Sequence, residues 1–219
     1  MKREERLEAE NDELRDDYAK LAALSSEDEP DEPLYKSIKK RAPWLIVLLF
    51  MGLAVSAVVG LFESVVEELP MIVAFQSLIL GMAGNVGTQS LAVTVRAIGS
   101  SERFRIREQL GTVWRETRVA FLNGILLGAI SFLIVGIYLG AFGAPPFGFT
   151  LAVAACVGGS MCFAMTVSGF TGAIIPITLY RLGADPAVAS GPLITTVNDL
   201  VAVVSYYSLA LLLLLGVVA

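Results

Sequence analysis

One carboxylate stands alone in the most apolar part of this sequence. From Pro186 to Ala219, Asp199 is the only charged residue, within a stretch that reads GPLITTVNDLVAVVSYYSLALLLLL. This stretch is long and apolar enough to cross a bilayer as a helix. A charged side chain near mid-membrane costs about 2.5–3.5 kcal/mol on insertion scales, and such residues usually face a water-filled path or a cation. Asp199 is therefore the first candidate for a functional residue, and it indicates a membrane cation transporter.

The residues before Asp199 favour the same function. Thr195 and Thr196 precede it by about one helical turn, so their hydroxyls are expected on the face that carries the carboxylate. Pro192, about two turns earlier, removes a backbone donor, and Gly191 beside it thins the helix because it has no side chain. A pore could open at this point. On this helix the residues predicted to line the path are Gly191, Pro192, Thr196 and Asn198, with Asp199 and Thr195 as the metal ligands.

A second apolar segment carries neutral polar groups in the run GMAGNVGTQS, residues 81–90. Asn85 and Gln89 are four residues apart and therefore share one helix face, while the glycines allow another backbone to approach closely. Taken alone, the run fits helix packing as well as contact with an ion. The residues of this run that we predict to line the pore are Gly84, Asn85, Gly87 and Gln89.

Acidic residues flank the apolar segments at two further places. Glu63, Glu67 and Glu68 could concentrate cations at an external mouth, or they could belong to an ordinary solvated loop. Asp185, next to Pro186, fits a helix N-cap, with a cation site at the inner mouth as the alternative.

The available ligand atoms indicate a hard cation. The sequence has no histidine, and Cys156 and Cys162 lie in an apolar stretch where thiols usually pack as small hydrophobic groups. Carboxylate, hydroxyl, amide and carbonyl oxygens suit magnesium, calcium and manganese. One carboxylate per chain suits Mg2+, which keeps several waters, and a two-fold axis would bring two copies of Asp199 to one ion. An intramembrane enzyme would need a second acid or a nucleophile and base at the same depth, so we predict no enzyme.

Composition and hydropathy predict an all-α integral membrane fold. Of the 219 residues, 55% are hydrophobic and 17% charged. Five apolar segments are predicted to span the membrane: 43–62, 71–95, 119–140, 149–179 (distorted or ended by Pro176) and 187–217. A polar loop is predicted between Arg96 and Arg118.

The sequence divides into two parts. Residues 1–33 form a charged N-terminal segment, a short helix or linker whose leucine heptads could pair in a coiled coil. Residues 34–219 form the membrane domain.

Lysine and arginine predict the orientation. All 16 lie in the N-terminal segment, between the second and third spans, or in the turn before the fifth span. These regions share one side of a five-helix chain, so the positive-inside rule puts the N-terminus in the cytoplasm and the C-terminus outside.

Three stretches resemble the transmembrane domain of the MgtE family of magnesium channels: RAPWLIVLLF (41–50), GMAGNVGTQSLAVTVRAI (81–98) and DPAVASGPLITTVNDL (185–200). The resemblance covers about residues 30–219. It implies a homodimer of five-helix protomers, with the second and fifth helices lining a pore on the two-fold axis, in the plasma (inner) membrane of a prokaryote. It also implies a largely hydrated Mg2+ bound by the helix-five acid of both subunits, which matches Asp199. A carbonyl-bearing position four residues earlier matches Thr195, whereas the asparagine that some members carry before the proline is Gly191 here.

The resemblance also implies a difference in regulation. Characterised bacterial members carry a cytosolic N domain and a pair of CBS domains that sense magnesium. Only about 30 residues precede the part that resembles the membrane domain, so we expect a pore without CBS-type gating, or one gated by another route.

Three alternatives for the function remain: a Na+-coupled Mg2+ exchanger, a broader divalent-cation transporter, and a membrane anchor for another protein. The expected partners are a second copy of the chain and the bilayer, with no nucleic acid.

Overall fold

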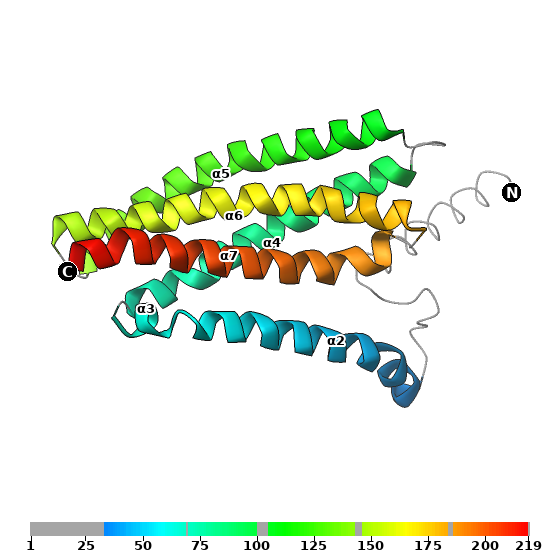
Figure 1. Ribbon diagram of the computed structural model, residues 1–219, viewed down its shortest axis with the longest axis horizontal. Helices are drawn as coiled ribbons and strands as arrows, with labels where there is room; N and C mark the ends of the chain where they lie inside the picture. Colours follow the sequence, from blue (N-terminus) through cyan, green and yellow to red (C-terminus); the bar gives the residue numbers. More distant parts are fainter. Residues whose placement is uncertain (1–32, 69, 100–104, 143–145, 184–185, 219) are drawn as a thin grey trace, which may run out of the picture.

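The computed structural model describes residues 33–68, 70–99, 105–142, 146–183 and 186–218, and all regular structure in these ranges is helical. The predicted all-α class is confirmed. The helices in chain order are α2 (Leu34–Gly60), α3 (Glu63–Glu68), α4 (Pro70–Gly99), α5 (Ile106–Phe142), α6 (Phe147–Arg181) and α7 (Pro186–Val218), as Figure 1 shows. The N-terminal segment that we predicted as a short helix or linker lies outside the described residues, apart from Pro33, and so does Asp185.

Four helices are long and apolar enough to cross a membrane: α4, α5, α6 and the part of α7 from Leu193 to Leu213. A fifth span is obtained if the two parts of α2, Leu34–Pro43 and Leu45–Gly60, count as one helix bent by 42°. The bend follows Pro43, whose ring removes a backbone donor from the helix. The described residues thus contain four or five candidate spans, where the sequence predicted five.

Helix ends differ from the prediction most clearly in α4 and α5. The region 96–118 was predicted as a polar loop, which is wrong: α4 continues to Gly99 and α5 already begins at Ile106. The reason is that charged residues end an apolar run without ending a helix. Arg107, Arg115 and Arg118 are exposed, whereas Gln109 and Glu116 on the opposite face are buried.

Two smaller expectations are also corrected. Pro176 does not end α6, which continues to Arg181, because neighbouring helices can satisfy the backbone groups that a proline frees inside a membrane helix. The segment after α2, for which an ordinary solvated loop was one interpretation, forms the six-residue helix α3, and its Val65 is fully buried.

The bundle is built around α6, which lies between α5 and α7 in Figure 1 and also packs on α4. More than half of its apolar window, 56%, is buried, the highest share among the four spans. Glycines permit the close approach: a Cβ on Gly128 of α5 would lie 2.6 Å from the carbonyl oxygen of Gly158 in α6. On the other side of α6, Gly172 crosses α4 at Gly87. Small residues thus let the helix backbones pack almost directly against each other.

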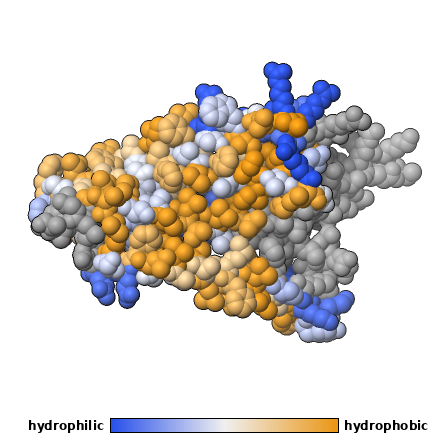
Figure 2. Space-filling view, viewed as in Figure 1, coloured by the Kyte–Doolittle hydropathy of each residue, from blue (hydrophilic) through white to orange (hydrophobic). Residues whose placement is uncertain are grey.

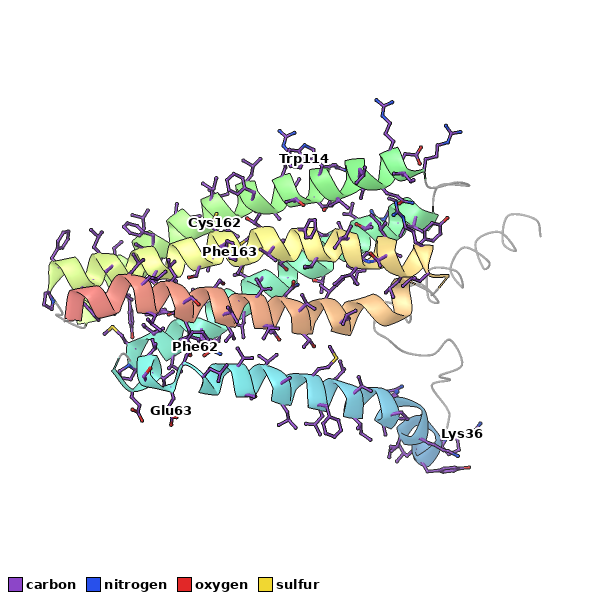
Figure 3. All side chains as sticks on the ribbon, in the orientation of Figure 1. Lys36, Phe62, Glu63, Trp114, Cys162 and Phe163 are labelled. Atoms are coloured by element: carbon purple, nitrogen blue, oxygen red, sulfur yellow. The ribbon has the colours of Figure 1, made fainter. Side chains whose placement is uncertain are left out.

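Basic residues gather at one end of the bundle. The first residues of α2, α5 and α7 and the last residues of α4 and α6 share this end, while α3 lies at the other (Figure 1). We call it the basic end, because Lys36, Arg96, Arg105 and Arg181 belong to it. Figure 3 shows Lys36 and Glu63 near opposite ends of the bundle. Figure 2 shows an apolar band between hydrophilic patches at the two ends, as expected for a protein that crosses a bilayer.

Candidate cation site

Asp199 lies on α7, half-buried, at the wall of a cavity of about 690 Å3 between α2, α4 and α7. Each of the three helices contributes side chains to this cavity, which we call the Asp199 cavity. Its lining residues are Leu48, Gly52 and Val55 of α2, Thr88, Leu91 and Ala92 of α4, and Gly191, Thr195, Thr196 and Asp199 of α7. The residues of α7 that line it follow the helical spacing predicted from the sequence.

The polar atoms of the cavity are mainly oxygens. Thr195 donates its hydroxyl proton to the carbonyl of Gly191 over 3.1 Å, and Thr88 donates to the carbonyl of Asn85 over 2.9 Å. Because a hydroxyl that donates to its own helix keeps its lone pairs, these oxygens remain acceptors for a cation or its water shell. In the part of the chain that the structure describes, no three His, Cys, Asp or Glu side chains cluster. The Asp199 cavity is therefore a site with one carboxylate and several neutral oxygens.

Asn198 does not line this cavity, although we predicted it among the pore-lining residues. It is almost fully buried, and its Oδ1 accepts a hydrogen bond of 2.7 Å from the Thr171 hydroxyl of α6. Successive residues are about 100° apart around a helix, so Asn198 faces the bundle while Asp199 faces the cavity. Within the described residues its Nδ2 has no hydrogen-bond partner.

The glycines of α4 fall into two groups. Gly87 is buried at the crossing with α6, and a Cβ on it would overlap the Asn198 amide, so Gly87 has a packing role rather than a place in the wall of the Asp199 cavity. Gly84 is only half-buried, and a Cβ there would meet nothing within 4 Å. A further bond holds the crossing, since Ser168 of α6 donates to the carbonyl of Ala83.

Asn85 and Gln89 lie on a different side of α4 from the Asp199 cavity. Both are exposed and line a second cavity of about 360 Å3, which we call the carboxamide cavity. Its other lining residues are Met82, Val86, Thr88, Asn123, Leu127 and Met165. Thr88 lines both cavities, so the two predicted groups of polar residues are neighbours on α4 without sharing one site.

The predicted mouth residues lie apart from both cavities. Glu63 and Glu67 are exposed on α3, at the end opposite the basic end. Asp185 and the side chain of Pro192 are outside the described part of the chain. The mouth roles of Glu63, Glu67 and Asp185 stay predictions.

Two tyrosines tie α7 to α4 and so fix the helix that carries Asp199. The Tyr206 hydroxyl donates to the carbonyl of Ile72 over 2.8 Å, and the Tyr207 hydroxyl is bonded to Oε1 of Gln76 over 2.6 Å. Tyr207 also stacks on Phe62, with ring centroids 5.4 Å apart. These partners could not be predicted from the sequence, because hydrogen bonds between helices far apart in the chain leave no regular residue spacing.

The contribution of α2 to the cavity was also missed. Leu48 and Val55 look like ordinary lipid-facing residues in the sequence. Gly52 was the one residue that could have indicated the part of α2 at the cavity, since a glycine within an apolar helix often marks a close approach of two helices or an open space. Here it faces open space, because a Cβ on Gly52 would meet nothing within 4 Å.

Known proteins with similar sequences show the family of this chain. The sequence model of the MgtE family, described as a divalent cation transporter, matches residues 76–209. The magnesium transporter MgtE of Enterococcus faecalis is 39% identical over 201 residues, which are 91% of this chain and 42% of the relative. The protein of the same name from Bacillus subtilis is 35% identical over 90% of this chain and 42% of the relative. That from Thermus thermophilus is 33% identical over 80% of this chain and 36% of the relative.

The chain thus spans about two fifths of the length of the first two of these relatives, of which it covers 42%. The family match includes the helices that bear Asn85, Gln89 and Asp199 and covers more than half of the sequence. On these grounds the chain belongs to the MgtE family of divalent cation transporters.

Proposed function

We propose that this chain carries Mg2+ across a membrane and that Asp199 binds the ion on its way. The observation that carries the proposal is the cavity at membrane depth in which Asp199 stands with several hydroxyl oxygens. Relatives that match nine tenths of the chain are named magnesium transporters.

The size of the cavity favours a hydrated ion. Mg2+ holds six ligands at octahedral positions and gives up its waters reluctantly. Six waters occupy about 180 Å3 at roughly 30 Å3 each, which is small beside the cavity of about 690 Å3. Asp199 and the threonines would then contact the ion largely through its water shell.

We further propose that two copies of the chain form the pore, with α4 and α7 of each copy lining it. A single carboxylate balances half the charge of Mg2+, and a second Asp199 across a two-fold axis would balance the rest. Asn85 and Gln89 support this arrangement, because exposed amides at membrane depth are costly unless water or a partner covers them. In this proposal the basic end faces the cytoplasm of a prokaryotic cell, following the positive-inside rule.

Uptake into proteoliposomes tests the function. Wild type is compared with Asp199→Ala, with Mg2+, Mn2+ and Ca2+ offered in turn and no sodium gradient. Mg2+ influx that disappears in the variant supports passive passage over Asp199, whereas influx that starts only when sodium is imposed supports the exchanger. Entry of Mn2+ or Ca2+ at the same rate as Mg2+ would support the broader transporter.

Cross-linking tests the dimer. In a variant without Cys156 and Cys162, the Gln89→Cys substitution places a thiol on the exposed face of α4. A disulfide between two chains in the membrane is expected if this face meets its symmetry mate. Trp114→Cys, on the outer face of α5, is the matched control and should stay monomeric.

A further inference from the structure

The helix α5 changes from charged to apolar at Arg118. This arginine is the last charged residue of the helix, and residues 119–142 after it carry no charge. That uncharged part is long enough to cross the hydrocarbon core of a bilayer, which takes about 20 residues. Arg118 therefore lies at the level where the hydrocarbon core meets the lipid headgroups, on the side of the basic end.

Three exposed side chains gather at this level. Trp114 is 65% exposed, and Arg115 and Arg118 are exposed beside it. The guanidinium of Arg118 lies over the Trp114 ring, 5.9 Å from its centroid, on the outside of the bundle (Figure 3). Arg115 is three residues from Arg118, so the two are neighbours on the helix surface. We call these three residues the arginine cluster. Tryptophan is enriched at the membrane interface, which agrees with this depth.

The positive charge of the arginine cluster is not balanced by an acid among the described residues. Neither Arg115 nor Arg118 forms an ion pair within them. Glu116 is buried on another side of α5, and Glu108, about two turns nearer the basic end, accepts the backbone N–H of Arg105 over 3.0 Å. Like charges on neighbouring positions of a helix repel each other, so an anion placed between the two guanidinium groups would stabilise them.

The helix face below the arginine cluster is apolar and uncovered. Leu122 and Ile125 follow Arg118 by about one and two turns on the same side of α5, and they are 61% and 48% exposed. Phe121 and Leu126 beside them are exposed as well. The neighbouring helix α6 packs on the other side of α5. A molecule that fits this surface therefore combines an anionic group with a long apolar part.

We propose that the arginine cluster binds the headgroup of an anionic phospholipid, whose acyl chain lies along Leu122 and Ile125. The planar guanidinium group of arginine matches a phosphate with two parallel hydrogen bonds. A basic residue at an anionic membrane surface contributes about fivefold in affinity. A zwitterionic lipid carries its own cation next to the phosphate, so it gains less from the two arginines. This site requires only that the chain crosses a membrane, and it does not depend on the proposed passage of Mg2+.

Quenching of Trp114 fluorescence by brominated lipids tests the site. The sequence contains two tryptophans, so Trp44→Phe leaves Trp114 as the only one. This protein is placed in bilayers of phosphatidylglycerol and phosphatidylcholine in which one of the two lipids is brominated on its acyl chains. We expect brominated phosphatidylglycerol to win at Trp114, with a relative affinity of at least about fivefold. Equal quenching by the two lipids would overturn the proposal.

Two double variants in the Trp44→Phe background separate a local site from the overall charge. Arg115→Gln with Arg118→Gln should bring the relative affinity close to one. The matched control, Arg105→Gln with Arg107→Gln, removes two exposed arginines at the start of the same helix, about two turns or more from the cluster, and should keep the preference.

A preference that survives the loss of Arg115 and Arg118, or that falls equally in both double variants, would overturn the proposal. Brominated phosphatidylcholine alone should quench Trp114 equally in all the proteins, because the fold that exposes Trp114 is unchanged. The measurement follows lipid contact and not transport, so it stays decisive even if the chain carries no Mg2+, which would overturn the proposed function instead.

Discussion

The Thr171 hydroxyl of α6 donates a hydrogen bond of 2.7 Å to Asn198 of α7, the residue next to Asp199. This bond fixes the rotation of α7 about its own axis. Because Asn198 is held against α6, the following side chain must turn toward the Asp199 cavity. The orientation of the candidate ligand thus depends on a contact on the other side of its helix.

Thr171→Val should lower both stability and transport. The substitution leaves the buried Asn198 side chain without a donor, at a cost of about 1–3 kcal/mol. We expect a lower midpoint of thermal unfolding in detergent and slower Mg2+ uptake. Thr166→Val is the control, since Thr166 bonds only to Cys162 within its own helix over 2.7 Å. Equal unfolding midpoints for the two variants would show that the Asn198 bond has no special role.

Gly172→Ala should destabilise the protein. A Cβ there would meet the carbonyl oxygen of Gly87 and lie 2.9 Å from the Cβ of Ser90, so α4 and α6 would have to separate. Forcing a methyl group into such a contact costs about 1–3 kcal/mol. Gly84→Ala is the matched control, because it adds the same methyl group where nothing lies within 4 Å. Thermal unfolding of the two variants should differ, and a stable Gly172→Ala would contradict the close crossing.

The bond between Tyr207 and Gln76 should be measurable as a coupling energy. Tyr207→Phe and Gln76→Leu each remove one partner of the 2.6 Å hydrogen bond. Each should cost about 0.5–1.5 kcal/mol of unfolding free energy, and the double variant should cost less than the sum. Strictly additive costs would mean that the two side chains do not interact in the membrane.

Asn85→Leu should slow Mg2+ uptake while leaving stability nearly unchanged. The side chain is exposed in the single chain, so its loss removes no packing, yet the proposed dimer places it at the pore. Leu78→Ala, also exposed on α4, is the control and should leave uptake at the wild-type rate. Full uptake by Asn85→Leu would assign the residue to helix packing or lipid contact.

Several features were predictable from the sequence because they follow from single-residue rules. The isolated charge at Asp199 stands out in any hydropathy reading, and α7, predicted at 187–217, is found as Pro186–Val218. The oxygens of Thr195 and Thr196 were expected beside it from the helical period, and both line the Asp199 cavity.

Other features depend on which face of a helix meets which neighbour. Asn198 and Asp199 are both polar and adjacent, and their side chains point about 100° apart around α7. Which of the two faces the bundle depends on Thr171, 27 residues away, which bonds to Asn198. The burial of Glu116 was not predicted, because the neighbouring Arg115 and Arg118 are typical of a polar loop. In the structure α5 buries the face with Glu116 and exposes the face with the two arginines. The roles of Glu63, Glu67 and Asp185 stay predictions.

Equilibrium binding of Mg2+ to the purified protein tests the central claim most directly. Isothermal titration calorimetry of wild type, Asp199→Asn and the control Glu108→Gln would compare the cavity acid with an exposed acid on α5. We expect Mg2+ binding to be lost in Asp199→Asn and kept in Glu108→Gln. Binding of equal strength in all three proteins would contradict it and place the ion elsewhere in the chain.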